Sequence, residues 1–160
     1  MKRIALAIVA ALSCVAANAQ WDYESSVDKM SSARKSVARL ASDSSLNLKF
    51  PYNGDNYSVI FVRKEGSAAA DVVLMVQKGQ LMCRIDDCTI RIRFDEAKPA
   101  RWSGTRPSDH SSTAMFLNRP AQFIAEAKKA KKILVEVDFF QQGTHVIEFT
   151  APTPLVWPPK

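Results

Sequence analysis

Apolar and polar residues alternate along most of the chain, which is the pattern of β-strands that bury one face. The clearest example is residues 89–95, where Ile90, Ile92 and Phe94 alternate with polar residues. Residues 71–77 (DVVLMVQ) are apolar on both faces, which favours a central strand. Shorter or weaker forms of the pattern predict further strands at residues 46–50, 57–63, 80–84, 133–139 and 144–150.

Turn-forming residues separate these segments. Lys78 and Gly79 precede residues 80–84, and Gln141, Gln142 and Gly143 separate the last two predicted strands. Several short strands joined by turns predict a mainly β fold, either a sandwich or a barrel. We expect an antiparallel β-sandwich-like domain formed by residues 20–160, because a chain of this length buries a core of ordinary size.

One segment has the period of a helix instead. Its apolar stripe consists of Phe123, Ile124 and Ala127. Asn118 is a suitable N-cap and Pro120 suits the first turn. The lysines of residues 128–132 complement the negative end of a helix dipole. The sequence therefore predicts one amphipathic helix at about residues 119–131, before the last strand pair.

Two segments are less regular. In residues 28–42, Met30, Ala33, Val37 and Leu40 have helical spacing, but residues 36–41 also alternate as a strand would, and both interpretations remain open. Residues 151–160 carry four prolines, which predicts an extended C-terminal tail.

The first nineteen residues have the three parts of a secretory signal peptide. Lys2 and Arg3 are positively charged, residues 4–12 are apolar, and residues 17–19 (ANA) form a cleavage site. We expect export to the periplasm or beyond, with cleavage near Ala19. The alternative is a lipoprotein acylated at Cys14, but the usual large aliphatic residue is missing before that cysteine. No other apolar run is long enough to span a membrane.

Charge adds little to this picture. The formal net charge is +6, and removal of Lys2 and Arg3 with the signal peptide leaves +4. This mild excess suits contact with an envelope protein or an anionic envelope component. Export argues against nucleic acid as a partner.

Cys83 and Cys88 have three possible roles. Zinc sites need four ligands, and only His110 and His145 are present in addition, neither of them close in sequence. A thioredoxin-type redox pair has two residues between its cysteines, but four separate these. Because an exported protein meets oxidising conditions, we expect a disulfide across a turn formed by residues 84–87, and neither a metal nor a cofactor.

Catalytic chemistry has weak support. Residues 108–112 (SDHSS) contain the residue types of a hydrolase triad, but adjacent residues do not converge as nucleophile, base and orienting group. His145 alternates with Ile147 and Phe149, which suggests a structural role on a strand. We therefore expect no catalytic residues.

Arginines provide the better candidate for binding. Arg91 and Arg93 point outward on their predicted strand, and Arg101 follows in a polar stretch with Trp102, which we expect to be an exposed contact residue. Arginine forks bind phosphates and carboxylates well. The alternative is a solvated sheet face with cross-strand ion pairs.

The order of short motifs resembles a family of exported, β-rich proteobacterial proteins. The motifs are Trp21-x-Tyr23, Phe50-Pro51-Tyr52-x-Gly54, Gly79-Gln80-Leu81-x-Cys83, CTIRIRFD at residues 88–95 and FFQQG at residues 139–143. In layout the chain is similar to the VasI/TagO accessory proteins of type VI secretion. The resemblance implies a β-rich periplasmic domain in which residues 37–41 form a strand, and it implies no catalytic residues.

These observations predict a non-enzymatic periplasmic accessory or binding protein of the cell envelope, with a secretion system as one setting. The alternative is a secreted inhibitor of a cell-wall hydrolase such as lysozyme, which would insert residues 108–113 into the enzyme's cleft. A third hypothesis is an enzyme that uses His110 or His145.

Overall fold

The computed structural model describes residues 20–84 and 87–159; the predicted signal peptide, Cys14 and the middle of the predicted 84–87 turn lie outside them. The described residues form ten strands and one helix. The strands of the first half are β1 (Asp22–Val27), β2 (Arg34–Ala41), β3 (Ser58–Glu65), β4 (Asp71–Val76) and β5 (Cys83–Arg84). The remaining elements are β6 (Asp87–Phe94), β7 (Ala100–Thr105), β8 (Ala114–Leu117), α1 (Pro120–Ala127), β9 (Lys132–Phe139) and β10 (Gly143–Thr150).

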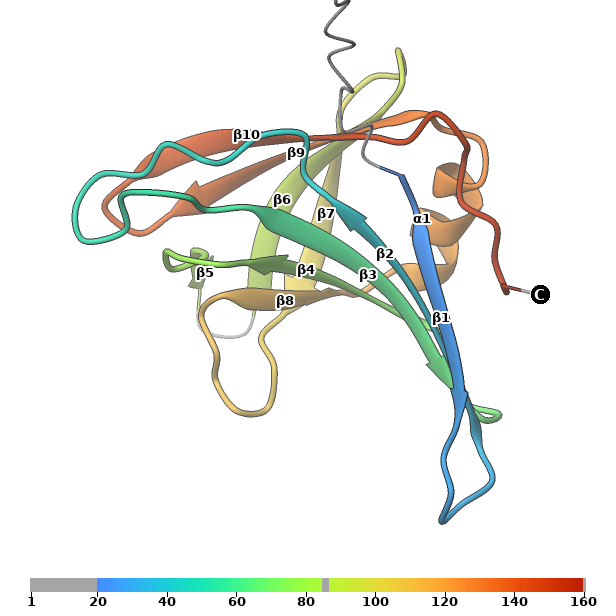
Figure 1. The fold of residues 1–160 in the computed structure, drawn as a ribbon. Helices are drawn as coiled ribbons and strands as arrows, with labels where there is room; N and C mark the ends of the chain where they lie inside the picture. Colours follow the sequence, from blue (N-terminus) through green and yellow to red (C-terminus); the bar gives the residue numbers. More distant parts are fainter. Residues whose placement is uncertain (1–19, 85–86, 160) are drawn as a thin grey trace, which may run out of the picture.

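All ten strands belong to one antiparallel sheet. Its order is β1-β2-β3-β4-β8-β7-β6-β9-β10, with the short β5 paired to β6. The sheet curls so that β2, β3 and β4 face β6 and β9 (Figure 1). The fold is therefore mainly β and sandwich-like, with one helix before the last strand pair, as the alternating pattern predicts.

The two halves of the sheet pack directly on each other. Ile60 and Leu74 from the first half and Ile92 and Val135 from the second line one small internal space of about 10 Å³. A space of this size holds at most one water molecule, so the layers are in close contact. The core residues of both halves belong to a single cluster.

Helix α1 closes one end of this core. Phe123 is fully buried, and its ring packs edge-to-face against Phe94 and Trp102 at centroid distances of 5.4 and 6.2 Å. The helix is shorter than predicted. Asn118 is not its cap, because its side-chain amide donates to Ser103 on β7 and Arg119 occupies the N-cap position.

The C-terminal tail is extended and docks on the core. Leu155 and Trp157 are buried, and the backbone N–H of Val156 donates to the Tyr23 hydroxyl on β1 at 2.9 Å. The two ends of the described chain therefore meet. No helix among the described residues has the length and apolarity needed to cross a membrane.

Strand pairing shows which of the less regular segments form strands. Residues 34–41 form strand β2, which pairs with both β1 and β3, so the helical interpretation of this segment is wrong. The strand predicted at residues 46–50 does not form. Leu46 and Leu48 are buried there without ladder partners, whereas Phe50 is 86% exposed.

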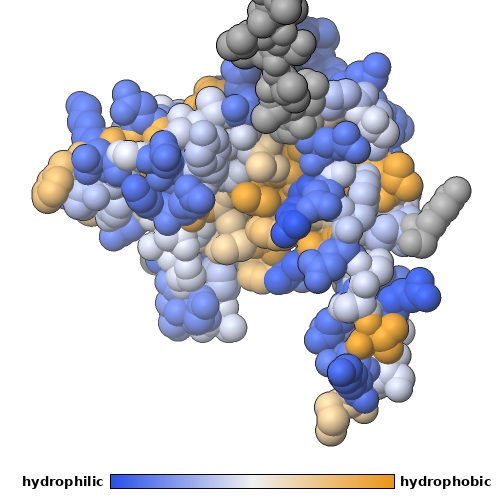
Figure 2. Space-filling view, viewed as in Figure 1, coloured by the Kyte–Doolittle hydropathy of each residue, from blue (hydrophilic) through white to orange (hydrophobic). Residues whose placement is uncertain are grey.

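The end of the β1–β2 hairpin projects from the body of the molecule (Figures 1 and 2). Every residue of β1 is exposed, and this end carries hydrophobic surface, with Val27 59% and Met30 95% exposed. Because β1 buries no side chain on this sheet edge, its sequence lacks the alternation that marks the other strands.

Candidate functional site

The outer face of β6 carries the predicted arginines. Along this strand Ile90, Ile92 and Phe94 are buried, so Arg91 and Arg93 point away from the core. The neighbouring strand β7 places Arg101 directly opposite Arg91 in the antiparallel register. The sheet therefore brings together Arg91, Arg93 and Arg101, as expected from their positions in sequence.

Arg91 and Arg101 form a like-charge cross-strand pair, an arrangement that normally destabilises a sheet. Arg91 is compensated on its other side by Glu136 of β9, with a nitrogen–oxygen distance of 2.9 Å. Arg101 contacts the Thr89 hydroxyl at 3.3 Å and makes no ion pair with any described residue. Among the described residues, Arg101 therefore has no carboxylate partner, in contrast to Arg91.

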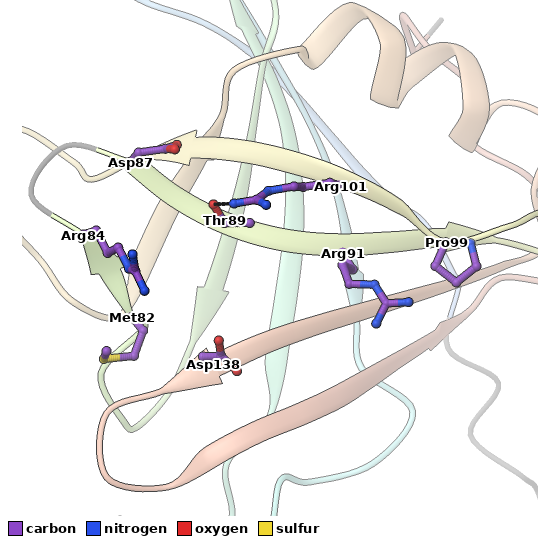
Figure 3. A pocket seen from close by; sticks show the side chains of 8 residues that line it. All are labelled: Met82, Arg84, Asp87, Thr89, Arg91, Pro99, Arg101 and Asp138. Carbon is purple, nitrogen blue, oxygen red and sulfur yellow. Dashed lines mark hydrogen bonds between the residues drawn. The ribbon is translucent and has the colours of Figure 1, made fainter.

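A hollow of about 700 Å³ opens beside this pair; we call it the arginine hollow. It is lined by Met82, Arg84, Asp87, Thr89, Arg91, Pro99, Arg101 and Asp138. In Figure 3, Met82, Arg84 and Asp138 lie at one end and Pro99 at the other, while Arg101 reaches across to Thr89. Three arginines and two aspartates face the same space, so the hollow is basic but of mixed sign.

The hollow exists because β6 and β9 separate. Their ladder covers Arg91–Phe94 of β6 and Ile133–Glu136 of β9 and goes no further. Beyond it, Asp138 and Phe139 of β9 contact residues 81 and 82 instead. A smaller hollow of about 100 Å³ lies in this split, lined by residues 89–91 of β6 and 136–138 of β9.

A third hollow, of about 130 Å³, adjoins the first on the same face; we call it the aliphatic hollow. It is lined by Arg91, Arg93, Pro99, Leu134, Glu136 and Val146. Arg91 and Pro99 line both hollows, so the two hollows adjoin at these residues. Arg93 takes part here with its charge already paired to Glu96.

Trp102 does not belong to this face, and its interpretation as an exposed contact residue is wrong. It is 2% exposed and lies opposite Ile90 in the register. Side chains alternate along a strand, so an outward Arg101 requires an inward Trp102. The Arg119 guanidinium covers the indole ring at 4.5 Å from its centroid, a cation–π contact.

Cys83 and Cys88 form the disulfide predicted from the sequence. They lie opposite each other on β5 and β6, with their Cα atoms 4.0 Å apart. Arg84 and Asp87, the next pair in the register, both line the arginine hollow. The disulfide is therefore architectural, and it fixes one wall of the hollow.

The two histidines lie apart from the arginine hollow. His145 contacts the backbone oxygen of Gln142 through Nε2 at 3.2 Å and packs edge-on against Phe139. His110 is exposed in the loop between β7 and β8. No group of metal-ligating side chains forms within the described ranges.

The loop of residues 108–113 projects between β7 and β8 (Figure 1). Its own side chains organise it: the Asp109 carboxylate accepts from the backbone of Ser111, and the Ser111 and Thr113 hydroxyls are 3.0 Å apart.

Two of the lysines after α1 make contacts within the sheet and with the turn after β6. Lys132 pairs with Glu148 across β9 and β10, and this hydrogen bond raises the pKa of the lysine. The backbone N–H groups of Lys131 and Lys132 donate to Asp95. Among the described residues, only Lys132 of this cluster has its side-chain charge paired. The cluster lines none of the hollows described above, so the arginine hollow is the stronger candidate for binding.

Sequence reasoning missed Asp138, Met82 and Pro99. Asp138 is an outward residue of β9, and its alternation with Val137 and Phe139 was the available signal. Its approach to β6 depends on the strand order, which alternation does not encode. Comparisons with models of known protein families, with curated proteins and with solved structures found no match to this chain.

Proposed function

We propose that this chain is a non-enzymatic binding protein of the bacterial cell envelope. Its arginine hollow would receive a carboxylate or phosphate group of an envelope component. The observation that supports this most directly is the opposed pair Arg91 and Arg101, of which only Arg91 has a described carboxylate partner. A bound anion would pair with the guanidinium of Arg101, which has no described carboxylate partner.

An envelope location is supported by the predicted signal peptide and is compatible with the disulfide, since disulfides persist in oxidising compartments. The resemblance in layout to the VasI/TagO proteins, expected from the sequence, makes a secretion system one setting for this role. A type VI secretion gene cluster beside the gene, together with a secretion defect on its deletion, would support that setting. A deletion strain that secretes normally would argue against it.

The anion site can be tested by NMR on the chain that starts at Gln20. Citrate and inorganic phosphate are titrated at constant ionic strength while the arginine Nε–Hε signals are followed. We expect saturable shifts for Arg91 and Arg101, and none for Arg34, an exposed strand arginine outside the hollow. The variant Arg101→Ala should lose the saturation and Arg34→Ala should keep it. Equal, non-saturating shifts at all arginines would rule out the proposed site.

A second candidate function is inhibition of a cell-wall hydrolase. It is favoured by the projecting loop of residues 108–113, whose internal hydrogen bonds pre-organise it for insertion into a cleft. Lysozyme assays with the wild-type chain and with Asp109→Ala separate the two roles. Inhibition that is lost in this variant would support the loop, and full lysozyme activity at excess chain would exclude inhibition of the enzyme tested.

A further inference from the structure

We infer that the occupant of this face is an extended segment of a partner protein in which an acidic side chain neighbours an aliphatic one. The acidic side chain lies in the arginine hollow and the aliphatic one in the aliphatic hollow. This inference rests on the proposed function and names the class of ligand.

The first argument is that the two hollows adjoin each other. The two hollows share Arg91 and Pro99, so one ligand can occupy both only by passing over these residues. A ligand that does so needs two chemically different groups, an anion for Arg101 and an apolar group for Leu134 and Val146. Val146 is 51% exposed, so covering it removes apolar surface from water.

Size is the second argument. The aliphatic hollow measures about 130 Å³. A protein cavity of about 150 Å³ accommodates a benzene-sized molecule. The hollow therefore has room for one aliphatic side chain, and it would contact only a few carbons of a longer acyl chain.

The backbone supplies the third argument. The ladder between β6 and β9 begins at Arg91, so Thr89 and Ile90 have no ladder partner on the side of β9. The small hollow in this split is lined by the same two residues and by Val137 and Asp138. Peptides that add to sheet edges use both their N–H and their C=O groups for such positions, whereas a lipid acyl chain offers neither and a simple anion can only accept hydrogen bonds.

The charges of the arginine hollow favour a protein segment over an anionic membrane as its occupant. Membrane surfaces attract clusters of like basic residues. Here Asp87 and Asp138 line the hollow together with its arginines, and Glu136 already holds Arg91. These carboxylates weaken the attraction of the hollow for a uniformly anionic surface, whereas a single acidic side chain directed at Arg101 avoids them. Charges of both signs in one binding site fix the position at which the acidic side chain of a bound segment lies.

The test is selection of a displayed library of random short peptides on the folded chain that starts at Gln20, followed by fluorescence anisotropy. We expect selected peptides that combine Asp or Glu with Leu, Ile or Val. Arg101→Ala should weaken their binding roughly ten-fold, and Val146→Thr roughly three-fold. Val146→Thr keeps a β-branched side chain on an exposed strand position and changes only its polarity.

Matched controls lie outside the face. Arg34→Ala and Val27→Thr replace an exposed arginine and an exposed strand valine elsewhere, and should leave binding within about two-fold of the wild type. Circular dichroism establishes that each variant is folded. Selected peptides without acidic residues would overturn the inference. So would peptides whose affinity changes with neither Arg101→Ala nor Val146→Thr.

An experiment with lipid vesicles distinguishes failure of the peptide inference from failure of the proposed anion site. Vesicles of equal parts phosphatidylcholine and phosphatidylglycerol are tested by co-sedimentation. If no peptide is enriched but vesicles bind and Arg101→Ala abolishes that binding, the occupant is a membrane surface; the peptide inference fails and the anion site stands. If citrate, phosphate, peptides and vesicles all fail to bind, the proposed function fails as well.

Discussion

The carboxylate of Asp43 holds Thr150, accepting hydrogen bonds from its backbone N–H at 2.8 Å and from its hydroxyl at 2.6 Å. The backbone N–H of Asp43 also donates to the oxygen of Glu148 at 2.8 Å. The segment that follows β2 is thereby fastened to β10, the last strand of the sheet. This contact joins the segment after β2, the second strand of the sheet order, to the last strand outside any strand ladder.

Asp43→Ala is therefore expected to lower the free energy of unfolding by about 1–2 kcal/mol, at the low end of the values for hydrogen bonds to a charged group because Asp43 is exposed. Chemical denaturation of the chain that starts at Gln20 measures this. Asp55→Ala is the matched control, because Asp55 is exposed and makes no hydrogen bond with a described residue. Equal stability changes in the two variants would contradict a fastening role for Asp43.

Two adjacent residues on β7 should respond in opposite ways to truncation. Trp102→Ala removes a buried ring from the core and should cost about 3–5 kcal/mol of stability. Arg101→Ala removes an exposed guanidinium and should change stability by less than about 0.5 kcal/mol. Denaturation curves of both variants make the comparison, and a small effect of Trp102→Ala would place its ring outside the core.

The disulfide should contribute modestly to stability. In the chain-entropy model, closing so short a loop stabilises a protein by about 2 kcal/mol. The double variant Cys83→Ala/Cys88→Ala should therefore fold, with its unfolding free energy lowered by that amount. A thiol assay on denatured, unreduced protein that starts at Gln20 should detect no free cysteine; two reactive thiols would disprove the bond.

Asp28 orders the turn between β1 and β2, and its ionisation should be visible in the pH dependence of that turn. Hydrogen bonds from Ser31 and Met30, followed by Lys35, hold the pKa of Asp28 down at about 2. Because the folded pKa is depressed, the stabilisation is complete above the ordinary value of 3.8 and is lost as pH falls through about 2. NMR titration of the Asp28 carboxyl should give this midpoint, and Asp28→Asn should remove the pH dependence of the Ser31 amide shift. A midpoint near 3.8 would mean that the turn does not hold the carboxylate.

Export can be tested at the N-terminus. Protein recovered from the periplasm of a proteobacterial host should begin near Gln20 or Trp21, as read by intact mass. Cys14→Ser should leave this mass and the yield unchanged, since Cys14 lies in the removed segment. A lipid-modified N-terminus at Cys14, or retention of residues 1–19, would contradict the predicted cleavage.

Alternation predicted the strands that bury one complete face. The strand at β6 was identified with the right face inward, and β9 and β10 were identified with the turn between them. The outward position of Arg91 and Arg93 follows from the same pattern. These predictions succeeded because burial on one face leaves a period of two in the sequence.

The remaining features of the fold depend on strand pairing and packing, which the alternation of residues does not reveal. Strand β7 has only Trp102 and Gly104 buried between polar neighbours, so its sequence resembles a loop. A Cβ atom added to Gly104 would lie 2.6 Å from the backbone oxygen of Phe116, so the pairing of β7 with β8 requires glycine there. The arginine hollow was predictable in its arginines alone, because the split between β6 and β9 depends on which strands are neighbours.

The sheet order also has a consequence for how the chain folds. Strands β1 to β4 are neighbours in the order in which they occur in the chain, so each pair closes only the segment between consecutive strands, the longest being residues 42–57. The pairs β4–β8 and β6–β9 instead join segments separated by several other elements, and they carry the larger loss of chain entropy. We expect the N-terminal meander to assemble first. The face that carries the arginine hollow depends on β6, β7 and β9, so we expect it to be completed only in the last and slowest step.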